Sequence, residues 1–163
     1  MVANITTTTV TIFINGQEYQ VGKDANIVDV AKELGIDIPV FCYHPKMEPV
    51  GMCRMCLVEI GRPMRDRATG QFVMENGAPK IQFMPKLETA CTNKVEDGMV
   101  VVTQSEKTAE AQKATVEFLL TSHPLDCPIC DKGGECPLQN LTMAHGPGKS
   151  RFPLDEKYRL AKN

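Results

Sequence analysis

The chain carries, from residue 9 onward, two stretches in which hydrophobic and polar residues alternate. Residues 9–21 read TVTIFINGQEYQV, and the dipeptide Asn15-Gly16 stands between the two stretches. Alternation of this kind is typical of a strand with one buried face. Asn-Gly readily adopts the positive φ angles of a type I′ turn. We therefore predict a β-hairpin over residues 9–21.

The spacing of hydrophobic residues then changes to that of a helix. Apolar residues recur at offsets of three, four and seven positions, at Ile27, Val30, Ala31 and Leu34. This spacing places them on one face of an α-helix. Asp24 or Asn26 can cap its start, and Gly35 stands where a glycine often ends a helix. We predict an amphipathic helix of about ten residues.

Two short runs of β-branched residues follow, LVEI after Cys56 and GMVVVT after Cys91. Both are bounded by glycine, so we predict a strand at each. Between them, residues 61–87 are rich in glycine and proline and contain Asn76-Gly77, which predicts a projecting hairpin or a long loop. The order hairpin, helix, loop, strand and strand indicates a small mixed sheet with a helix packed across it.

A second helical pattern covers residues 105–122. Its apolar stripe contains Ala109, Gln112, Val116, Leu119 and Leu120. Thr103 and Glu106 have the spacing of a capping box. Pro124 disfavours the α conformation at His123, so the helix is expected to stop there and to present the imidazole at its C-terminal end. We expect little regular structure in the residues that follow.

These patterns divide the chain into two domains and place it in the α+β class. Residues 1–104 hold the predicted sheet and its helix, and residues 105–163 hold the second helix and a segment organised by metal ligands. With 163 residues, the chain is long enough to bury a core without disulfides.

Charge and hydropathy exclude several classes of protein. A formal net charge of −2 with 23% charged residues gives no reason to expect binding to nucleic acid or to anionic lipid. The first residues, MVANITTTTV, lack the basic and apolar regions of a signal peptide. No run approaches the roughly eighteen apolar residues of a membrane span. We expect a cytoplasmic protein without direct membrane insertion.

Seven cysteines fall into two separated groups, so disulfides alone cannot pair them all. The first group is Cys42, Cys53, Cys56 and Cys91. The second is preceded by a histidine, so that its four potential donors are His123, Cys127, Cys130 and Cys136. Tetrahedral metal sites and iron–sulfur clusters take four donors, and these two sets leave no cysteine over.

The first set has the spacing C-x10-C-x2-C with a distant fourth cysteine. Plant-type ferredoxins, which bind a [2Fe-2S] cluster, have the same arrangement with a shorter first gap. Gly51 would let the backbone turn tightly, so that amide groups can point at the sulfurs. A four-cysteine zinc site usually has two close cysteine pairs, whereas this set has one. The spacing favours an iron–sulfur cluster over zinc.

The second set has the spacing H-x3-C-x2-C-x5-C. A [4Fe-4S] cluster fits it, and so does a structural zinc held by three thiolates and one imidazole. Gly133-Gly134 would allow the backbone to approach the cluster sulfides closely. The spacing by itself leaves both cofactors open.

Three motifs, PVGMCRMCLVEIG, KLETACTNKVEDGMVV and LLTSHPLDCPICDKGGECPLQ, lie between Thr9 and Pro153. Together they resemble the N-terminal part of the large iron–sulfur subunit of respiratory complex I, the proton-pumping NADH:quinone oxidoreductase. The resemblance implies a β-grasp ferredoxin-like domain over residues 1–104, with a [2Fe-2S] cluster on Cys42, Cys53, Cys56 and Cys91. It also implies an irregular segment within residues 105–163, with a [4Fe-4S] cluster on His123, Cys127, Cys130 and Cys136.

The resemblance further implies an electron carrier without an active site of its own, and the sequence offers no dinucleotide fingerprint or nucleophile–base pair. Electrons from NADH would arrive through a flavin-bearing subunit and leave through other iron–sulfur subunits toward quinone. The complex would hold the chain at the cytoplasmic face of the membrane. Iron–sulfur subunits of NAD-linked hydrogenases and formate dehydrogenases share both motifs and are the alternative. A zinc-stabilised interaction module is the alternative from another class.

Overall fold

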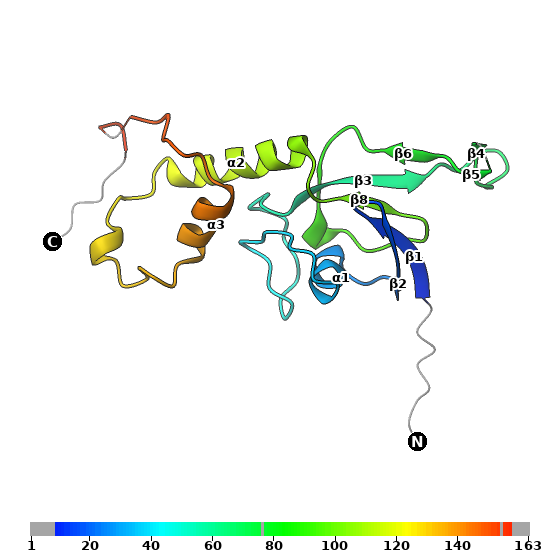
Figure 1. Cartoon of the computed structure of the whole chain (residues 1–163), viewed down its shortest axis with the longest axis horizontal. Helices are drawn as coiled ribbons and strands as arrows, with labels where there is room; N and C mark the ends of the chain where they lie inside the picture. The colour runs from blue at the N-terminus through cyan, green and yellow to red at the C-terminus, as the bar shows by residue number, and fades with distance from the viewer. Residues whose placement is uncertain (1–8, 76, 154, 158–163) are drawn as a thin grey trace, which may run out of the picture.

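A sheet domain and a helical extension lie side by side along the longest axis of the molecule (Figure 1). The computed structural model describes residues 9–75, 77–153 and 155–157. No helix built from these residues has the length and hydrophobicity needed to cross a bilayer.

The sheet domain begins with the predicted hairpin. β1 (Thr9–Ile14) pairs antiparallel with β2 (Gln17–Gly22). The turn residues Asn15 and Gly16 have φ angles of 50° and 83°, as a type I′ turn requires. The prediction from alternation is confirmed.

The sheet is mixed, with strand order β2-β1-β8-β3-β6. β8 (Val100–Val102) runs parallel to β1, and β3 (Leu57–Pro63) runs antiparallel to β8. β6 (Ile81–Phe83) and the short β7 (Glu88–Thr89) both pair antiparallel with β3. Both strands predicted from β-branched runs are therefore present in a mixed sheet.

Helix α1 (Ile27–Glu33) packs against this sheet and is capped by one of the two predicted candidates. The Asn26 side chain accepts a hydrogen bond from the Val28 N–H at 2.8 Å, whereas Asp24 adopts a φ of 64° in the preceding turn. Gly35 has a φ of 74°, so it ends the helix as predicted.

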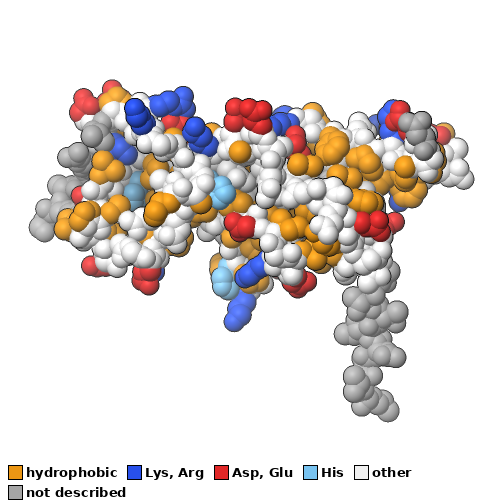
Figure 2. All heavy atoms as spheres, in the orientation of Figure 1, with side chains coloured by type: hydrophobic (Ala, Val, Ile, Leu, Met, Phe, Trp, Pro, Cys, Tyr) orange, Lys and Arg blue, Asp and Glu red, His pale blue; other side chains and the backbone are white. Residues whose placement is uncertain are grey.

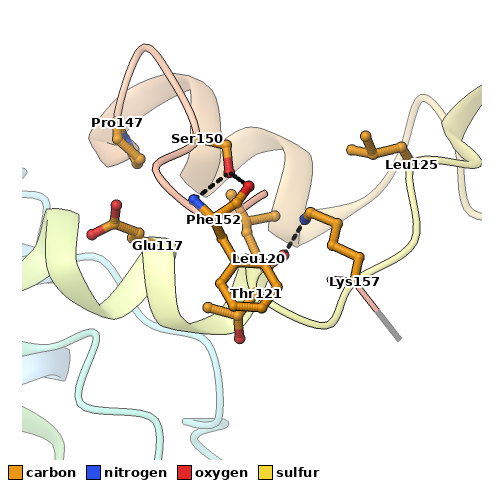
Figure 3. A pocket seen from close by; sticks show the side chains of 8 residues that line it. All are labelled: Glu117, Leu120, Thr121, Leu125, Pro147, Ser150, Phe152 and Lys157. Atoms are coloured by element: carbon orange, nitrogen blue, oxygen red, sulfur yellow. Dashed lines mark hydrogen bonds between the residues drawn. The ribbon is translucent and has the colours of Figure 1, made fainter. Parts of the chain in front are cut away.

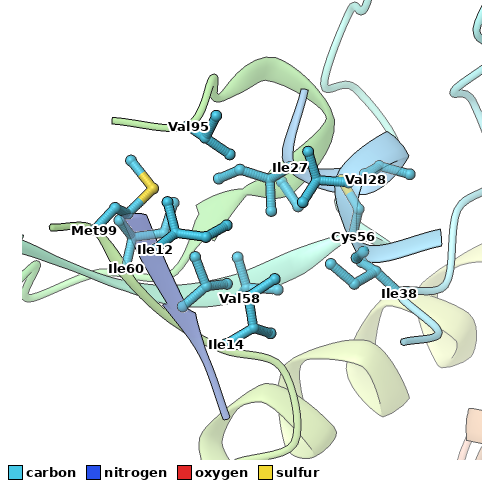
Figure 4. Packing of buried hydrophobic residues seen from close by; sticks show 14 of the residues in the cluster. Ile12, Ile14, Ile27, Val28, Ile38, Cys56, Val58, Ile60, Val95 and Met99 are labelled. Atoms are coloured by element: carbon cyan, nitrogen blue, oxygen red, sulfur yellow. The ribbon is translucent and has the colours of Figure 1, made fainter. Parts of the chain in front are cut away.

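The core of the domain lies between α1 and the sheet (Figure 4). Its fully buried side chains come from β1, α1, β3 and β8 and the loops beside them, and include Ile12, Ile14, Ile27, Val58, Ile60, Met99 and Val101. Each such aliphatic side chain stabilises the fold by roughly 1.5–3 kcal/mol. Cys56 and Cys91 are each only 1% exposed and belong to the same core, so two of the predicted ligands are part of the packing.

Residues 61–87 form the projecting hairpin rather than a long loop. β3 extends through Pro63 and pairs with β6, and beyond them β4 (Met74–Glu75) pairs with β5 (Ala78–Pro79) at the far end of the molecule (Figure 1). Gly77 has a φ of 85°, and Asn76 lies outside the described residues.

Helix α2 (Glu106–Leu120) is capped differently from the prediction. The cap is Ser105, whose hydroxyl accepts a hydrogen bond from the Thr108 N–H at 3.2 Å. Thr103 instead exchanges two hydrogen bonds with the Asn15 side chain, at 2.8 and 2.9 Å. The capping box of Thr103 and Glu106 was therefore wrong, because the hairpin turn already uses the polar groups of Thr103.

The buried stripe of α2 also differs in one position. Thr108, Gln112 and Val116 face inward at four-residue steps, whereas Ala109 is exposed because it lies about 100° around the helix from Thr108. The helix ends at Leu120, before the predicted end at Ser122, and the His123 N–H donates to the Leu120 carbonyl at 3.3 Å.

The segment after His123 is more regular than predicted. It contains a short 3₁₀ turn, η2 (Cys127–Ile129), and a nine-residue helix, α3 (Pro137–His145), that packs against α2. The signal for α3 was present in the sequence: Pro137 opens the helix, Gly146 follows its end, and Leu138 is its buried residue. The predicted irregular segment is thus a loop closed at both ends by helices.

Candidate iron–sulfur centres

The first cysteine set lies where the core meets two loops of the sheet domain. Cys56 directly precedes β3, and Cys91 lies in a 3₁₀ turn, η1 (Ala90–Thr92), after β7. Both are buried, whereas Cys53 is half-buried and Cys42, in the loop that follows α1, is exposed. The site therefore has one buried side and one open side.

The structure brings these four thiols together as two pairs. The Cys42 and Cys53 side chains share a hydrogen bond, and so do the Cys56 and Cys91 side chains. The close C-x2-C pair of the sequence is thus divided between the two pairs. A [2Fe-2S] cluster takes two thiolates on each iron, so this pairing fits its ligand requirement.

Backbone amides surround the open pair. Burial acts to raise the pKa of the Cys42 thiol, but hydrogen bonds from Cys53 and from the Met52 backbone outweigh it, and the net pKa is lowered. The Met55 N–H donates to the Cys53 sulfur at 3.4 Å. Amide donors of this kind stabilise anionic sulfur, as the tight turn at Gly51 predicted.

Gly51 is required at its position for two reasons. Its φ is 61°, and a Cβ there would stand 2.9 Å from the Thr92 side-chain methyl group. Arg54 adopts a φ of 60° in the same loop. Two left-handed residues within four positions curl the loop, so that successive amides converge on the cysteine sulfurs.

The buried pair has the opposite electrostatics. Burial, together with the Cys91 and Cys53 side chains, raises the pKa of the Cys56 thiol to about 12, against a lowering hydrogen bond from the Cys91 backbone. A thiolate at this place needs a cation beside it, and a metal centre supplies one when it displaces the proton.

Several side chains that the sequence analysis did not single out hold these loops. The Tyr43 hydroxyl donates to the Asp29 carboxylate at 2.6 Å, which ties the Cys42 loop to α1. Burial and Asp29 raise the pKa of Tyr43 to about 12, so the phenol keeps its proton. The Asn26 amide donates to the Cys91 carbonyl at 2.5 Å. These partners lie far apart in the sequence, and no local pattern points to them.

The second donor set lies along the loop between α2 and α3. His123, Cys127 and Cys130 are exposed, and Cys136 is the half-buried N-cap residue of α3. The loop is tight, because the Gly133 N–H donates to the Cys130 carbonyl at 2.9 Å. A Cβ on Gly133 would stand 2.8 Å from the Cys127 carbonyl oxygen, so only glycine fits this approach.

Across residues 9–75, 77–153 and 155–157, no three His, Cys, Asp or Glu side chains converge as a preformed metal site. The first set is gathered into pairs, and the second is confined to one loop without being closed. Three thiols and one imidazole within that loop remain a suitable donor set for a [4Fe-4S] cluster or for zinc.

Comparison with known families decides the class of cofactor. Residues 7–106 match the model of the 2Fe-2S iron-sulfur cluster binding domain. The chain belongs to this family. Residues 112–151 match a second model, the NADH-ubiquinone oxidoreductase-G iron-sulfur binding region, which is a 4Fe-4S region. The chain therefore carries binding regions for a [2Fe-2S] and a [4Fe-4S] cluster, as predicted.

The curated relatives carry names of a single complex. The chain is 44% identical over 149 residues to NADH-quinone oxidoreductase subunit 3 of Thermus thermophilus, covering 91% of this chain and 18% of that protein. Identity is 43% to an NADH-quinone oxidoreductase subunit of Streptomyces coelicolor, covering 88% and 15%, and 39% to the NADH-ubiquinone oxidoreductase 75 kDa subunit of Reclinomonas americana, covering 88% and 18%. The chain thus spans less than a fifth of these relatives' length. The resemblance found in the motifs is confirmed.

A solved structure of related fold comes from a hydrogenase. It is an NAD+-reducing [NiFe]-hydrogenase in the H2-reduced state, with a TM-score of 0.64 and 25% identity, covering 90% of this chain and 54% of that one. The two motifs are thus shared outside complex I, as the sequence analysis expected.

Proposed function

We propose that this chain is an electron-transfer module of an NADH:quinone oxidoreductase and relays electrons from a flavin-bearing subunit toward quinone. The observation that carries the proposal is the arrangement of four thiols as two amide-lined pairs, in a chain that also has the histidine-led second set. When bound, each cluster supplies one-electron transfer, and the protein positions and tunes it.

Cys42 and Cys53 would hold one iron of the [2Fe-2S] cluster, and Cys56 and Cys91 the other. The hydrogen-bonded pairing of the thiols supports this division. The buried pair excludes water from one side of the site, and the amides of the curled loop offer hydrogen bonds to sulfur on the other.

His123, Cys127, Cys130 and Cys136 would hold the [4Fe-4S] cluster. The packing of α3 on α2 supports this assignment, because it anchors both ends of the loop that carries the donors. The division into a [2Fe-2S] domain over residues 1–104 and a [4Fe-4S] domain over residues 105–163 belongs to the same proposal.

The proposed partners are a flavin-bearing, NADH-oxidising subunit and other iron–sulfur subunits of a membrane-associated complex, at the cytoplasmic face of the membrane. Exposed apolar side chains at the open side of the first site, Met47, Val50 and Met52, support burial against another protein. Figure 2 shows further hydrophobic side chains gathered over the hairpin of β3 and β6, where Phe83 and Met84 are exposed.

A hydrogenase subunit is the second candidate, and it rests on the structural likeness at 25% identity. Identities of 39–44% to complex I subunits favour the first candidate. A zinc-stabilised module is disfavoured by both family models, which describe iron–sulfur binding.

Metal and sulfide analysis of chain reconstituted without oxygen tests the proposal. One [2Fe-2S] and one [4Fe-4S] cluster give about six iron and about six acid-labile sulfide per chain. About two zinc and no sulfide would reject electron transfer in favour of the structural module.

A further inference from the structure

Helix α2 ends beside a buried lysine. Lys157 is only 8% exposed, and its ammonium group donates to the carbonyl of Leu120, the last residue of the helix, at 2.6 Å (Figure 3). The same nitrogen lies 3.5 Å from the His123 carbonyl. The last carbonyls of a helix have no partner within the helix, and a cation there is also favoured by the helix dipole.

The polypeptide that carries Lys157 is fastened to α2 at a second point. Arg151 forms a bidentate ion pair with Glu117, with its Nε donating at 2.6 Å. Between the two points the segment folds over the end of α2 and encloses a cavity of about 120 Å³, lined in part by Leu120, Leu125 and Phe152 (Figure 3). Because Glu117 and Leu120 lie one turn apart, the segment spans the last turn of the helix.

The contacts of Lys157 converge on the turn that carries His123. The His123 N–H donates to the Leu120 carbonyl at 3.3 Å, so Lys157 contacts carbonyls at both ends of this turn. The imidazole itself is exposed, and among the hydrogen bonds found for the described residues, those of His123 involve its backbone. The place of the imidazole is therefore set by its backbone.

We propose that Lys157 is a positioning residue for the histidine donor of the second site. The inference rests on the proposed function, in which His123 is a cluster ligand. A lysine is rarely buried unless its charge is bonded, and here the bonds lock the one donor that lies outside the cysteine loop. The buried positive charge beside that donor also favours the reduced, more negative state of the bound cluster.

The test compares Lys157→Met with Lys149→Met, an exposed lysine of the same region, in the full chain. Hydrogen exchange of residues 120–126 is measured in the apoprotein, and the potentials and spectra of both clusters are measured by electron paramagnetic resonance after reconstitution. Loss of a bond to a charged group costs about 1.5–3 kcal/mol, so exchange in Lys157→Met should rise by at least about tenfold. The [4Fe-4S] potential should fall, while the [2Fe-2S] signal stays unchanged and reports that the sheet domain is folded.

Two further variants separate the roles of bond and charge. Lys157→Arg should restore both slow exchange and potential, and Lys157→Gln should keep part of the protection while the potential falls. Behaviour of Lys157→Met equal to that of Lys149→Met would overturn the inference, and so would faster exchange with an unchanged [4Fe-4S] spectrum and potential. If the unmodified chain binds no [4Fe-4S] cluster, the proposed function fails instead, and the exchange data alone decide whether Lys157 holds the turn.

Discussion

The two pairs of thiols differ in charge preference because their immediate surroundings differ. Amides of a curled loop favour the charged form at Cys42, and burial favours the neutral form at Cys56. One site thus combines a pair ready to ionise with a pair that resists ionisation until a metal arrives. Counting cysteines predicted the donors but not this difference, because it arises from packing around residues distant in the sequence.

Gly51→Ala tests the curled loop. The substitution adds a strained left-handed alanine and a contact with Thr92, so the apoprotein should lose about 1–3 kcal/mol in free energy of unfolding. Iron retention at the first site should fall with it. The matched control is Gly70→Ala, because Gly70 has a φ of 70° with nothing within 4 Å of its Cβ position. Equal losses in urea unfolding for both variants would show that the contact with Thr92 does not matter.

The raised pKa of Cys56 predicts a pH dependence of the apoprotein. The folded state holds the thiol neutral up to about 12, whereas the ordinary pKa is 9.0, so the unfolded chain loses this proton first. The stabilisation is complete below about pH 9 and is lost as pH rises toward 12. Urea midpoints measured from pH 8 to pH 10.5 should fall less steeply in Cys56→Ala than in the unmodified chain. Parallel curves would contradict the assignment.

Individual elements were predictable where their own residues decide them. Alternation around Asn15-Gly16 fixed the hairpin, and the spacing from Ile27 fixed α1. The cap of α2 was not predictable, because Thr103 is claimed by Asn15, which is 88 positions away. Helix α3 has start and stop signals, but they follow a cysteine-rich loop and only one of its residues is buried, so its apolar stripe is weak.

The sheet domain should fold as an element without α2. A fragment of residues 1–104 keeps all strands and the bonds between Thr103 and Asn15, and the matching family model ends nearby, at residue 106. We expect it to bind about two iron and two sulfide per chain. Because α2 contacts β3, a fragment ending at residue 120 should be the more stable of the two in thermal unfolding. Precipitation of the shorter fragment as apoprotein, or failure to bind iron, would disprove the boundary.

At the scale of the whole molecule, the two donor sets share no residue and lie on different elements, one on the sheet domain and one on the helical extension. Sequence spacing separated the sets correctly as groups, because each set has its own cluster of close positions. It did not decide zinc or iron at the second set, because the same donors serve both metals.

Losses at the two sites should therefore be independent. His123→Ala should reduce iron from about six toward about two per chain, while the rhombic resonance signal of the reduced [2Fe-2S] centre remains. Cys56→Ala should remove that signal and leave about four iron. Iron analysis and low-temperature spectra of both variants check this. Loss of the [2Fe-2S] signal in His123→Ala would contradict the partition of ligands.

The unequal burial of the two thiol pairs also gives the first site a direction of access. Cys56 and Cys91 stand at 1% exposure inside the core, and reagents in solution meet Cys42 and Cys53 first. An alkylating reagent should label the apoprotein in that order, with the inner pair reacting only as fast as the core opens. Oxidants and chelators approach from the same end. A subunit that covers this end would therefore shield the cluster from chemical attack, so its lifetime in air would measure how well the complex is assembled.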